Sequence, residues 1–212
     1  MSAWITVIGI GEDGMEGLDP SRIALIEKAD VLIAGVRHHS KVKNSKAEIL
    51  DWGHGFDHAL NELKARRGKN IVVLASGDPM HFGVGSVLVR AFGEDAVTVH
   101  PAPSSFSLAA ARMGWPIPDI DCLTIHGRPM AILIKYIFPG ARLLVLSHDG
   151  SSPAKVASLL TEKGYGKSQI SVLEHLGGNN EKRMDGSAAT WNYSNARDLN
   201  TLAIKCVAEI DT

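Results

Sequence analysis

The segment Ser76-Gly77-Asp78-Pro79-Met80-His81-Phe82-Gly83 places a carboxylate among residues that shape a turn. It follows the apolar, β-branched run 71–75, which is typical of a buried strand, and it precedes an amphipathic stretch with helical periodicity. Gly77 tolerates backbone angles that are closed to other residues, and Pro79 fixes its own φ and drives Asp78 toward an extended conformation. The segment therefore predicts a rigid turn at the carboxyl end of a strand, where open α/β sheets bind ligands. An ordinary structural turn is the alternative.

A second glycine-rich segment, Gly9-Ile10-Gly11-Glu12-Asp13-Gly14, fits the G-x-G-x-x-G spacing of a dinucleotide site. In that type of site the helix begins inside the glycine motif, so that its N-terminus faces the pyrophosphate. Here Asp19 is the predicted N-cap and Pro20 the first helical residue. An NAD(P)-dependent oxidoreductase stays an alternative, and it requires a helix that begins between Gly11 and Gly14.

Ionisable and hydroxyl side chains follow two further predicted strands. Arg37 and His38 come after the strand expected over 31–34, where they could bind anionic groups of a ligand or form a solvated loop. Ser104 or Ser105 is expected to cap a helix that continues to Met113, and such hydroxyls can also bind a ligand lying over the helix N-terminus.

The alternation of strands and helices predicts an α/β protein with a mostly parallel sheet in the first half and a mixed sheet in the second. Trp115-Pro116-Ile117-Pro118 cannot continue a helix, so we expect a domain over 1–114, a linker over 115–118 and a second domain over 119–212. Strands are expected over 4–10, 31–34, 71–75, 96–101, 123–126, 142–146, 170–174, 181–184 and 199–207. Helices are expected from Asp19 and over 56–67, 84–92, 107–113, 130–138 and 151–160.

Composition excludes several classes of partner. The 212 residues carry a formal net charge of −1 with no block of like charge, which argues against nucleic acid and anionic membranes. No apolar stretch approaches membrane-spanning length, and the N-terminus shows no secretion signal. Cys122 and Cys206 lack metal-type spacing, so we expect no metal site and two buried, reduced thiols in a cytoplasmic protein.

Several of these segments together resemble the tetrapyrrole methylases. The matching pieces are Val7-Ile8-Gly9-Ile10-Gly11, Ser76-Gly77-Asp78-Pro79 with Phe82-Gly83, and Pro103-Ser104-Ser105. Within that family the chain is most similar to the precorrin-6Y C5,15-methyltransferase group. That similarity is carried by Arg37-His38, 111–116, 147–153 and 173–178. The first loop departs from the family, because Glu12-Asp13-Gly14 stands where a proline and a glycine are usual.

The resemblance implies a two-domain, class III methyltransferase fold that uses S-adenosylmethionine and releases S-adenosylhomocysteine. It implies methylation at C5 of a precorrin-6/7-type intermediate in cobalamin biosynthesis, an in-line transfer in which the protein mainly aligns the reactants. It also implies a homodimer and a CbiT-like C15-methyltransferase and decarboxylase, either as a separate partner or as a fused domain. A non-catalytic subunit that holds a tetrapyrrole for another enzyme is an alternative.

The resemblance also implies site residues. The cofactor is expected to lie folded between the two domains, against Gly77, Asp78, Pro79, Met80, His81, Ser105, Phe106, Ser147, His148, Leu176, Thr201 and Leu202. Substrate contacts are expected at Gly11, Glu12, Arg37, His38, Arg112 and Arg128, since precorrins carry many carboxylates. For the cationic residues, a plain surface ion pair is an equal alternative. The proton lost from C5 could pass to His81, His148, Glu174, His175 or solvent.

Overall fold

The computed structural model describes residues 3–39, 42, 46–52, 55–194 and 196–209, with Phe56 described by its backbone alone. It divides into two compact units, Met1–Ser104 and Ser105–Thr212. The division falls ten residues before the boundary expected at 114. The reason is that helix α5 (Ser105–Met113) packs on the second sheet, where its buried Phe106 and Ala109 contact Leu144 and Leu173. The expected linker at 115–118 leads into a short 3-10 turn at Ile117–Asp119.

The first unit contains a five-stranded, all-parallel sheet in the order β3-β2-β4-β1-β5. Its two central strands are long apolar runs that are buried on both faces, as parallel strands covered by helices must be. The strands are β1 (Ile5–Ile10), β2 (Val31–Ile33), β3 (Glu48–Leu50), β4 (Ile71–Ser76) and β5 (Val97–His100).

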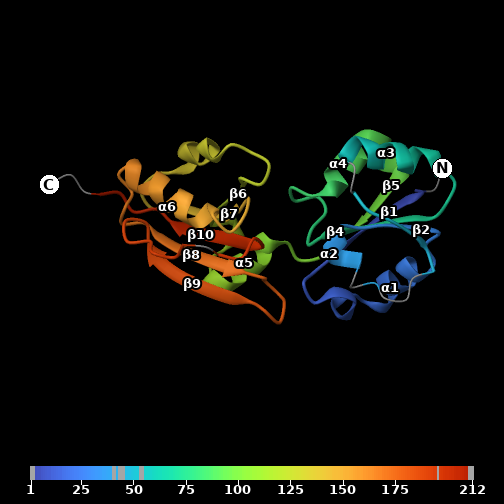
Figure 1. Ribbon diagram of the computed structural model, residues 1–212, viewed down its shortest axis with the longest axis horizontal. Coiled ribbons are helices and arrows are strands. Elements are labelled where there is room, and N and C mark those ends of the chain that lie inside the picture. The colour runs from blue at the N-terminus through green and yellow to red at the C-terminus, as the bar shows by residue number, and fades with distance from the viewer. Residues whose placement is uncertain (1–2, 40–41, 43–45, 53–54, 195, 210–212) are drawn as a thin grey trace. The chain divides into compact units, whose positions relative to one another are not determined.

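Helices cover both faces of this sheet, α3 and α4 on one and α1 and α2 on the other (Figure 1). Alternate residues of each strand divide between the two cores: Val7 and Val73 pack toward α3 and α4, while Ile8 and Leu74 pack toward α1. The helices are α1 (Pro20–Glu27), α2 (Val36–His39), α3 (Phe56–Ala65) and α4 (Val84–Phe92).

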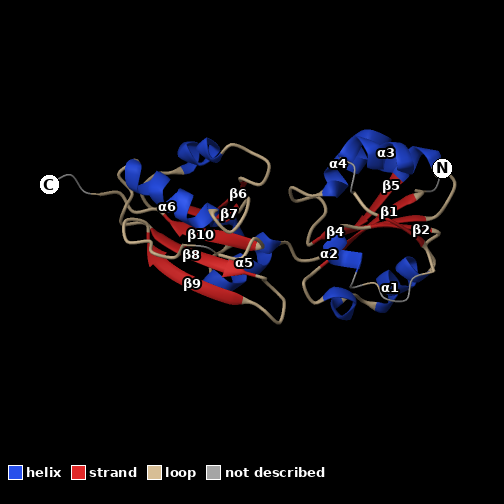
Figure 2. Ribbon diagram, viewed as in Figure 1, coloured by secondary structure: helices blue, strands red, loops and turns tan. Residues whose placement is uncertain are grey.

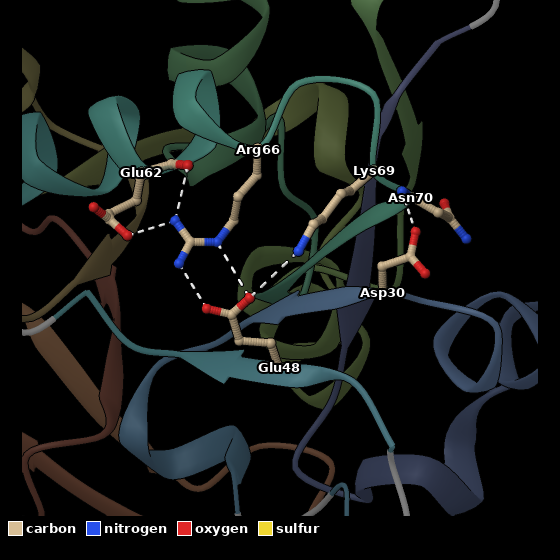
Figure 3. Close-up of polar contacts among 6 residues, drawn as sticks. All are labelled: Asp30, Glu48, Glu62, Arg66, Lys69 and Asn70. Atoms are coloured by element: carbon tan, nitrogen blue, oxygen red, sulfur yellow. Dashed lines mark hydrogen bonds and ion pairs between the residues drawn. The ribbon is translucent and has the colours of Figure 1, made fainter.

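The edge strand β3 is tied to its neighbours by an ionic network (Figure 3). The Arg66 guanidinium donates to Glu48 of β3 at 2.6 Å and to Glu62 of α3 at 2.5 Å, and Lys69 lies 3.8 Å from Glu48. The hydrogen bond that Arg66 donates to Glu48, and then the one that it donates to Glu62, raises the pKa of Arg66. The sequence pattern had missed β3, and this network shows what holds so short and exposed a strand in place.

The second unit contains a five-stranded mixed sheet in the order β6-β7-β10-β8-β9 (Figure 2). β6 and β7 are parallel, and the remaining pairs are antiparallel. The expected contrast between a parallel first sheet and a mixed second sheet is confirmed. The strands are β6 (Asp121–Thr124), β7 (Arg142–Leu146), β8 (Gln169–Glu174), β9 (Lys182–Ser187) and β10 (Asn200–Lys205).

One face of the second sheet is covered by helix α6 (Ser152–Glu162) together with a 3-10 segment at Met130–Tyr136, and the other face by α5. The helix expected over 130–138 was wrong in type, because the chain forms 3-10 turns over Met130–Tyr136 and ends them before Pro139-Gly140. None of the helices in the described ranges is both long and apolar enough to cross a bilayer.

Candidate functional site

The turn that follows β4 is organised by Asp78. Its Oδ1 accepts a hydrogen bond of 2.8 Å from the Met80 N–H, and its carbonyl oxygen accepts one of 3.1 Å from the His81 N–H. Gly77 adopts a left-handed φ of 59°, and Pro79 is buried. The carboxylate is therefore held by its own turn, half-buried, at the carboxyl end of a central parallel strand.

Two glycines allow three strand ends to meet at this edge of the sheet. A Cβ on Gly9 would overlap the Gly77 carbonyl oxygen and lie 2.5 Å from the Ala102 nitrogen. A Cβ on Gly77 would lie 3.1 Å from the Pro103 carbonyl oxygen. The Ala102 N–H donates to the Gly77 carbonyl at 3.3 Å, so the turns after β4 and β5 are bonded to each other.

This packing accounts for the first glycine of the G-x-G-x-x-G segment without a dinucleotide. Helix α1 begins at Pro20, where the Asp19 carboxylate accepts from the Ser21 and Arg22 N–H groups, as the sequence predicted. A four-residue 3-10 turn, and not the α-helix, begins at Gly14. The α-helix that an NAD(P) site requires at Gly11 to Gly14 is therefore not formed there.

Two of the substrate-binding residues expected in the first unit, Arg37 and His38, contact one hydroxyl. Arg37 Nη2 donates to Ser76 Oγ at 3.2 Å, and His38 Nε2 lies 3.3 Å from the same oxygen. Arg37 also lies 3.7 Å from a Glu12 carboxylate oxygen. These contacts connect the ends of three strands: Glu12 follows β1, Arg37 and His38 follow β2, and Ser76 is the last residue of β4. We call these four residues the Ser76 junction.

Two turns that the sequence singled out carry unusual backbone conformations. Phe82 has a φ of 57° and His175 a φ of 47°, and among the described residues they are the only non-glycine residues with positive φ. Such strain costs about 1–3 kcal/mol per residue and clusters at functional sites. Phe82 is also exposed, with its ring 5.3 Å from the ring of His81.

In the second unit several of the predicted residues lie at one end of the sheet. Thr201 pairs with Leu146, and Asn200 pairs with Glu174, so the carboxyl ends of β7 and β8 lie beside the amino end of β10. The turns at Ser147 and His175 follow directly from those ends.

A buried amide holds these turns together. The Ser147 hydroxyl donates to Asn200 Oδ1 at 2.6 Å, and Asn200 Nδ2 donates to the carbonyls of Arg197 and Asp149 at 2.7 and 3.3 Å. The Glu174 carboxylate, also buried, accepts from the Arg197 N–H at 2.6 Å. We call the first four residues, Ser147, Asp149, Arg197 and Asn200, the Asn200 clamp. The sequence analysis assigns no role to Asn200, and it assigns none to the side chain of Ser76 although Ser76 begins the Gly77–Asp78–Pro79 segment.

Arg112 makes a bidentate ion pair with Glu181, at 2.5 and 3.0 Å. Glu181 also accepts from the Gly177 N–H at 2.7 Å. The hydrogen bonds from Arg112 hold the pKa of Glu181 below its usual range. Arg112 therefore forms the surface ion pair that we gave as the alternative to substrate binding. Through Glu181 this ion pair holds the turn at Gly177.

The remaining predicted residues divide by exposure. Arg128 lines a cavity of about 370 Å³ together with His148, and Asp149 and Lys155, which were not predicted site residues, line it too. The rings of His148 and His126 lie 5.6 Å apart. Phe106, Leu176, Thr201 and Leu202 are buried, and the backbone of Leu202 is paired with strands on both sides, so the second sheet itself uses these residues. Ser105 is the first residue of α5. Among the described residues, no group of three or more His, Cys, Asp or Glu side chains could hold a metal ion.

Comparisons with known proteins agree with this architecture. Residues 5–191 match the model of the tetrapyrrole (corrin/porphyrin) methylases. A precorrin-6Y C(5,15)-methyltransferase [decarboxylating] of Sinorhizobium sp. is 41% identical over 99% of this chain and 51% of its own length. A cobalt-precorrin-7 C(5)-methyltransferase of Salmonella typhimurium is 30% identical over 84% of this chain and 88% of its own length.

Among solved structures, the precorrin-6Y methylase (cbiE) of Archaeoglobus fulgidus superposes with a TM-score of 0.69. It is 26% identical, and the match covers 97% of this chain and 98% of that one. The chain spans about half the length of the C(5,15) relatives it matches. The parallel and mixed sheets, the Gly77–Asp78–Pro79 turn and the extent of these matches lead to one conclusion: the chain belongs to the tetrapyrrole methylase family.

Proposed function

We propose that this chain methylates C5 of a precorrin-6/7-type tetrapyrrole in cobalamin biosynthesis, with S-adenosylmethionine as the methyl donor. The supporting observation is the pattern of matched lengths. The relative named for C5 alone is matched over 88% of its length, whereas the relatives named for C5 and C15 are matched over 51%. The reaction at C5 is the one that both names share.

The donor supplies an already activated methyl group, so the chain's residues contribute binding and alignment. We assign the methionine part of the donor to the turn 77–81, where Asp78 offers a half-buried carboxylate to an ammonium group and the turn offers backbone groups. Ser105 and Phe106 are assigned beside this part of the donor. In the second unit, the turns after β7 and β8, with Ser147, His148, Leu176, Thr201 and Leu202, are assigned to the adenosine.

Asp78 gives the first test of this assignment. Asp78→Ala should weaken binding of S-adenosylhomocysteine at least tenfold, because a charge-assisted hydrogen bond contributes about 1.5–3 kcal/mol. Isothermal titration calorimetry measures this, with Asp51→Ala as a control carboxylate in the same unit and circular dichroism as the check on folding. Unchanged affinity in folded Asp78→Ala protein would remove Asp78 from the site.

Substrate carboxylates are assigned to cationic groups near the two sheet edges. Arg37 and His38 supply them in the first unit, beside Gly11 and Glu12, and Arg128 supplies one in the second. Arg112 is assigned a secondary role in substrate binding, because its Nε and Nη2 already donate to the two carboxylate oxygens of Glu181.

The group that accepts the C5 proton is proposed from four candidates: His81, His148, Glu174 and His175. Glu174 is the most constrained, because it is buried and already bonded to the Arg197 N–H. Single replacement of each histidine by Asn and of Glu174 by Gln, followed by kcat measurement across pH, identifies the group. A base will show a loss of at least a hundredfold in kcat and the loss of one limb of the pH profile.

The decisive experiment is incubation with labelled S-adenosylmethionine and a late precorrin, followed by mass and position analysis of the product. Label at C5 supports the proposal. Tetrapyrrole binding without transfer, with the C15 partner present, would support the non-catalytic subunit instead. Heat from NAD(P)H but not from S-adenosylhomocysteine would support the oxidoreductase.

The assembly is also proposed. We infer a homodimer in the cytoplasm that works with a CbiT-like C15-methyltransferase and decarboxylase, as a separate protein or a fused domain. The C(5,15) relatives, which are about twice the matched length, support the C15 partner, and the two unpaired cysteines support the cytoplasm. The homodimer rests on the family resemblance. Light scattering that gives the monomer mass would contradict the dimer.

A further inference from the structure

The side-chain hydroxyl of Ser76 contacts two predicted substrate-binding residues at once. It accepts from Arg37 Nη2 at 3.2 Å and lies 3.3 Å from His38 Nε2. A serine hydroxyl has one donor and two acceptor positions, so it can bond both partners whichever tautomer His38 adopts. Alanine offers neither function, and threonine offers both.

Strand register explains why this residue, and no neighbour, makes the contact. Ser76 is the last residue of β4 and pairs with Ile10 of β1, while Ile33 at the end of β2 pairs with Val73. β4 therefore runs three residues beyond β2, and its final side chain reaches the helix α2 that carries Arg37 and His38. The next residue, Gly77, donates its N–H to the Ile10 carbonyl at 3.0 Å and begins the Asp78 turn.

We propose that Ser76 is a positioning residue that fixes the Arg37 guanidinium and the His38 imidazole beside the donor-binding turn. Arg37 is thereby oriented toward a carboxylate of an acidic tetrapyrrole. This inference rests on the proposed function, and it adds a residue that touches neither donor nor substrate.

The weak contact between Arg37 and Glu12 supports the idea that a substrate carboxylate can replace Glu12. Its contact with Glu12, at 3.7 Å, is longer than a hydrogen bond, and the Arg37 side chain is 49% exposed. A substrate carboxylate can therefore take the second position on the guanidinium while Ser76 keeps the first. Glu12 then acts as the counter-charge of Arg37 when the substrate is absent.

The test compares Ser76→Ala, Ser76→Thr and the control Ser187→Ala. Ser187 also carries a side-chain hydroxyl bond, to Thr190 at 2.6 Å, but lies on β9 of the other unit. Ser76→Ala should raise KM for the tetrapyrrole about tenfold, which corresponds to about 1.4 kcal/mol. It should leave kcat within about threefold and the Kd of S-adenosylhomocysteine within about twofold, because the Asp78 turn is intact. Ser76→Thr should restore KM, and Ser187→Ala should match the wild type.

Three results would overturn the inference: an unchanged KM in Ser76→Ala, a donor Kd weakened as much as KM, or no rescue by threonine. If the wild-type protein transfers no methyl group, the proposed function fails separately, and titration with uroporphyrin as an acidic tetrapyrrole probe decides the inference. Tenfold weaker probe binding by Ser76→Ala supports it. Equal binding by the two proteins, or no binding by either, overturns it.

Discussion

Replacing Asn200 by Ala tests how the second unit holds its turns. The change removes the acceptor of the Ser147 hydroxyl and the donor to the Arg197 and Asp149 carbonyls. Asn200 is 6% exposed and Ser147 is 7% exposed, so water has little access to the groups that lose their partner. No other part of the Asn200 clamp is altered.

The expected cost follows from these contacts. A neutral hydrogen bond contributes about 1 kcal/mol net, and a buried group left without a partner costs about 1–3 kcal/mol. The 3.3 Å bond to Asp149 is the weakest of the three, so we expect a total loss of about 3 kcal/mol. Ser147→Ala removes one bond and should cost about 1 kcal/mol.

Hydrogen exchange read by mass spectrometry localises the effect. Peptides from β7, β8 and β10 should exchange about 100-fold faster in Asn200→Ala, in line with a loss of about 3 kcal/mol. Peptides from β1 and β4 serve as an internal control, since they belong to the other unit and should keep their rates.

Asn200→Asp sharpens the comparison. Aspartate keeps an acceptor for Ser147 but places a carboxylate oxygen against two carbonyl oxygens, so it should be at least as harmful as alanine. Rates within threefold of wild type in Asn200→Ala would refute the reasoning. Equal costs for Ser147→Ala and Asn200→Ala would show that the hydroxyl alone carries the stabilisation.

Three further predictions concern packing and titration. Gly9→Ala should lower the free energy of unfolding, measured by urea denaturation, by about 3 kcal/mol, because the new Cβ would overlap backbone atoms. The control Gly35→Ala, with no atom within 4 Å of its Cβ, should stay near wild type. Similar stabilities of the two variants would contradict the close approach at Gly9. The Arg112 hydrogen bonds lower the folded pKa of Glu181, so the stability they confer is present above pH 4.5 and is lost as pH falls through the folded value. Glu181→Gln should lack this acid dependence, and an identical pH profile would argue against the ion pair. Burial raises the pKa of Cys206 from 9.0 to about 11, so its contribution is complete below pH 9 and declines as pH rises toward 11. Cys206→Ala should lose that decline, and an equal slope in both proteins would place its origin elsewhere.

The elements predicted most accurately are those that are specified by residues within or next to them. The start of α1 was predicted at the right residue, because Asp19 and Pro20 are cap and first-turn residues in their own right. β4 and its turn were found from an apolar run followed by Gly77 and Pro79. β3 and α2 were missed, because neither is long enough to show a period.

Features that depend on distant partners were not accessible from local patterns. Nothing near Ser105 indicates that α5 packs with the second sheet, so local signals place the boundary at Trp115-Pro116, whereas the structure divides between Ser104 and Ser105. Asn200 and Ser76 owe their importance to residues 53 and 38 positions away. For Arg112 the sequence leaves a substrate contact and a surface ion pair as equal alternatives, because its partner Glu181 lies 69 residues further along the chain.

The central position of β10 has a consequence for the order of folding. β10 follows all the other strands of its sheet in sequence, yet it separates β7 from β8 and pairs with both. While the chain is being synthesised, β7 and β8 each have one unpaired edge until residues 200–205 have been made. The second sheet is therefore completed only when β10 joins the pairs β6–β7 and β8–β9, and until then the exposed strand edges favour aggregation.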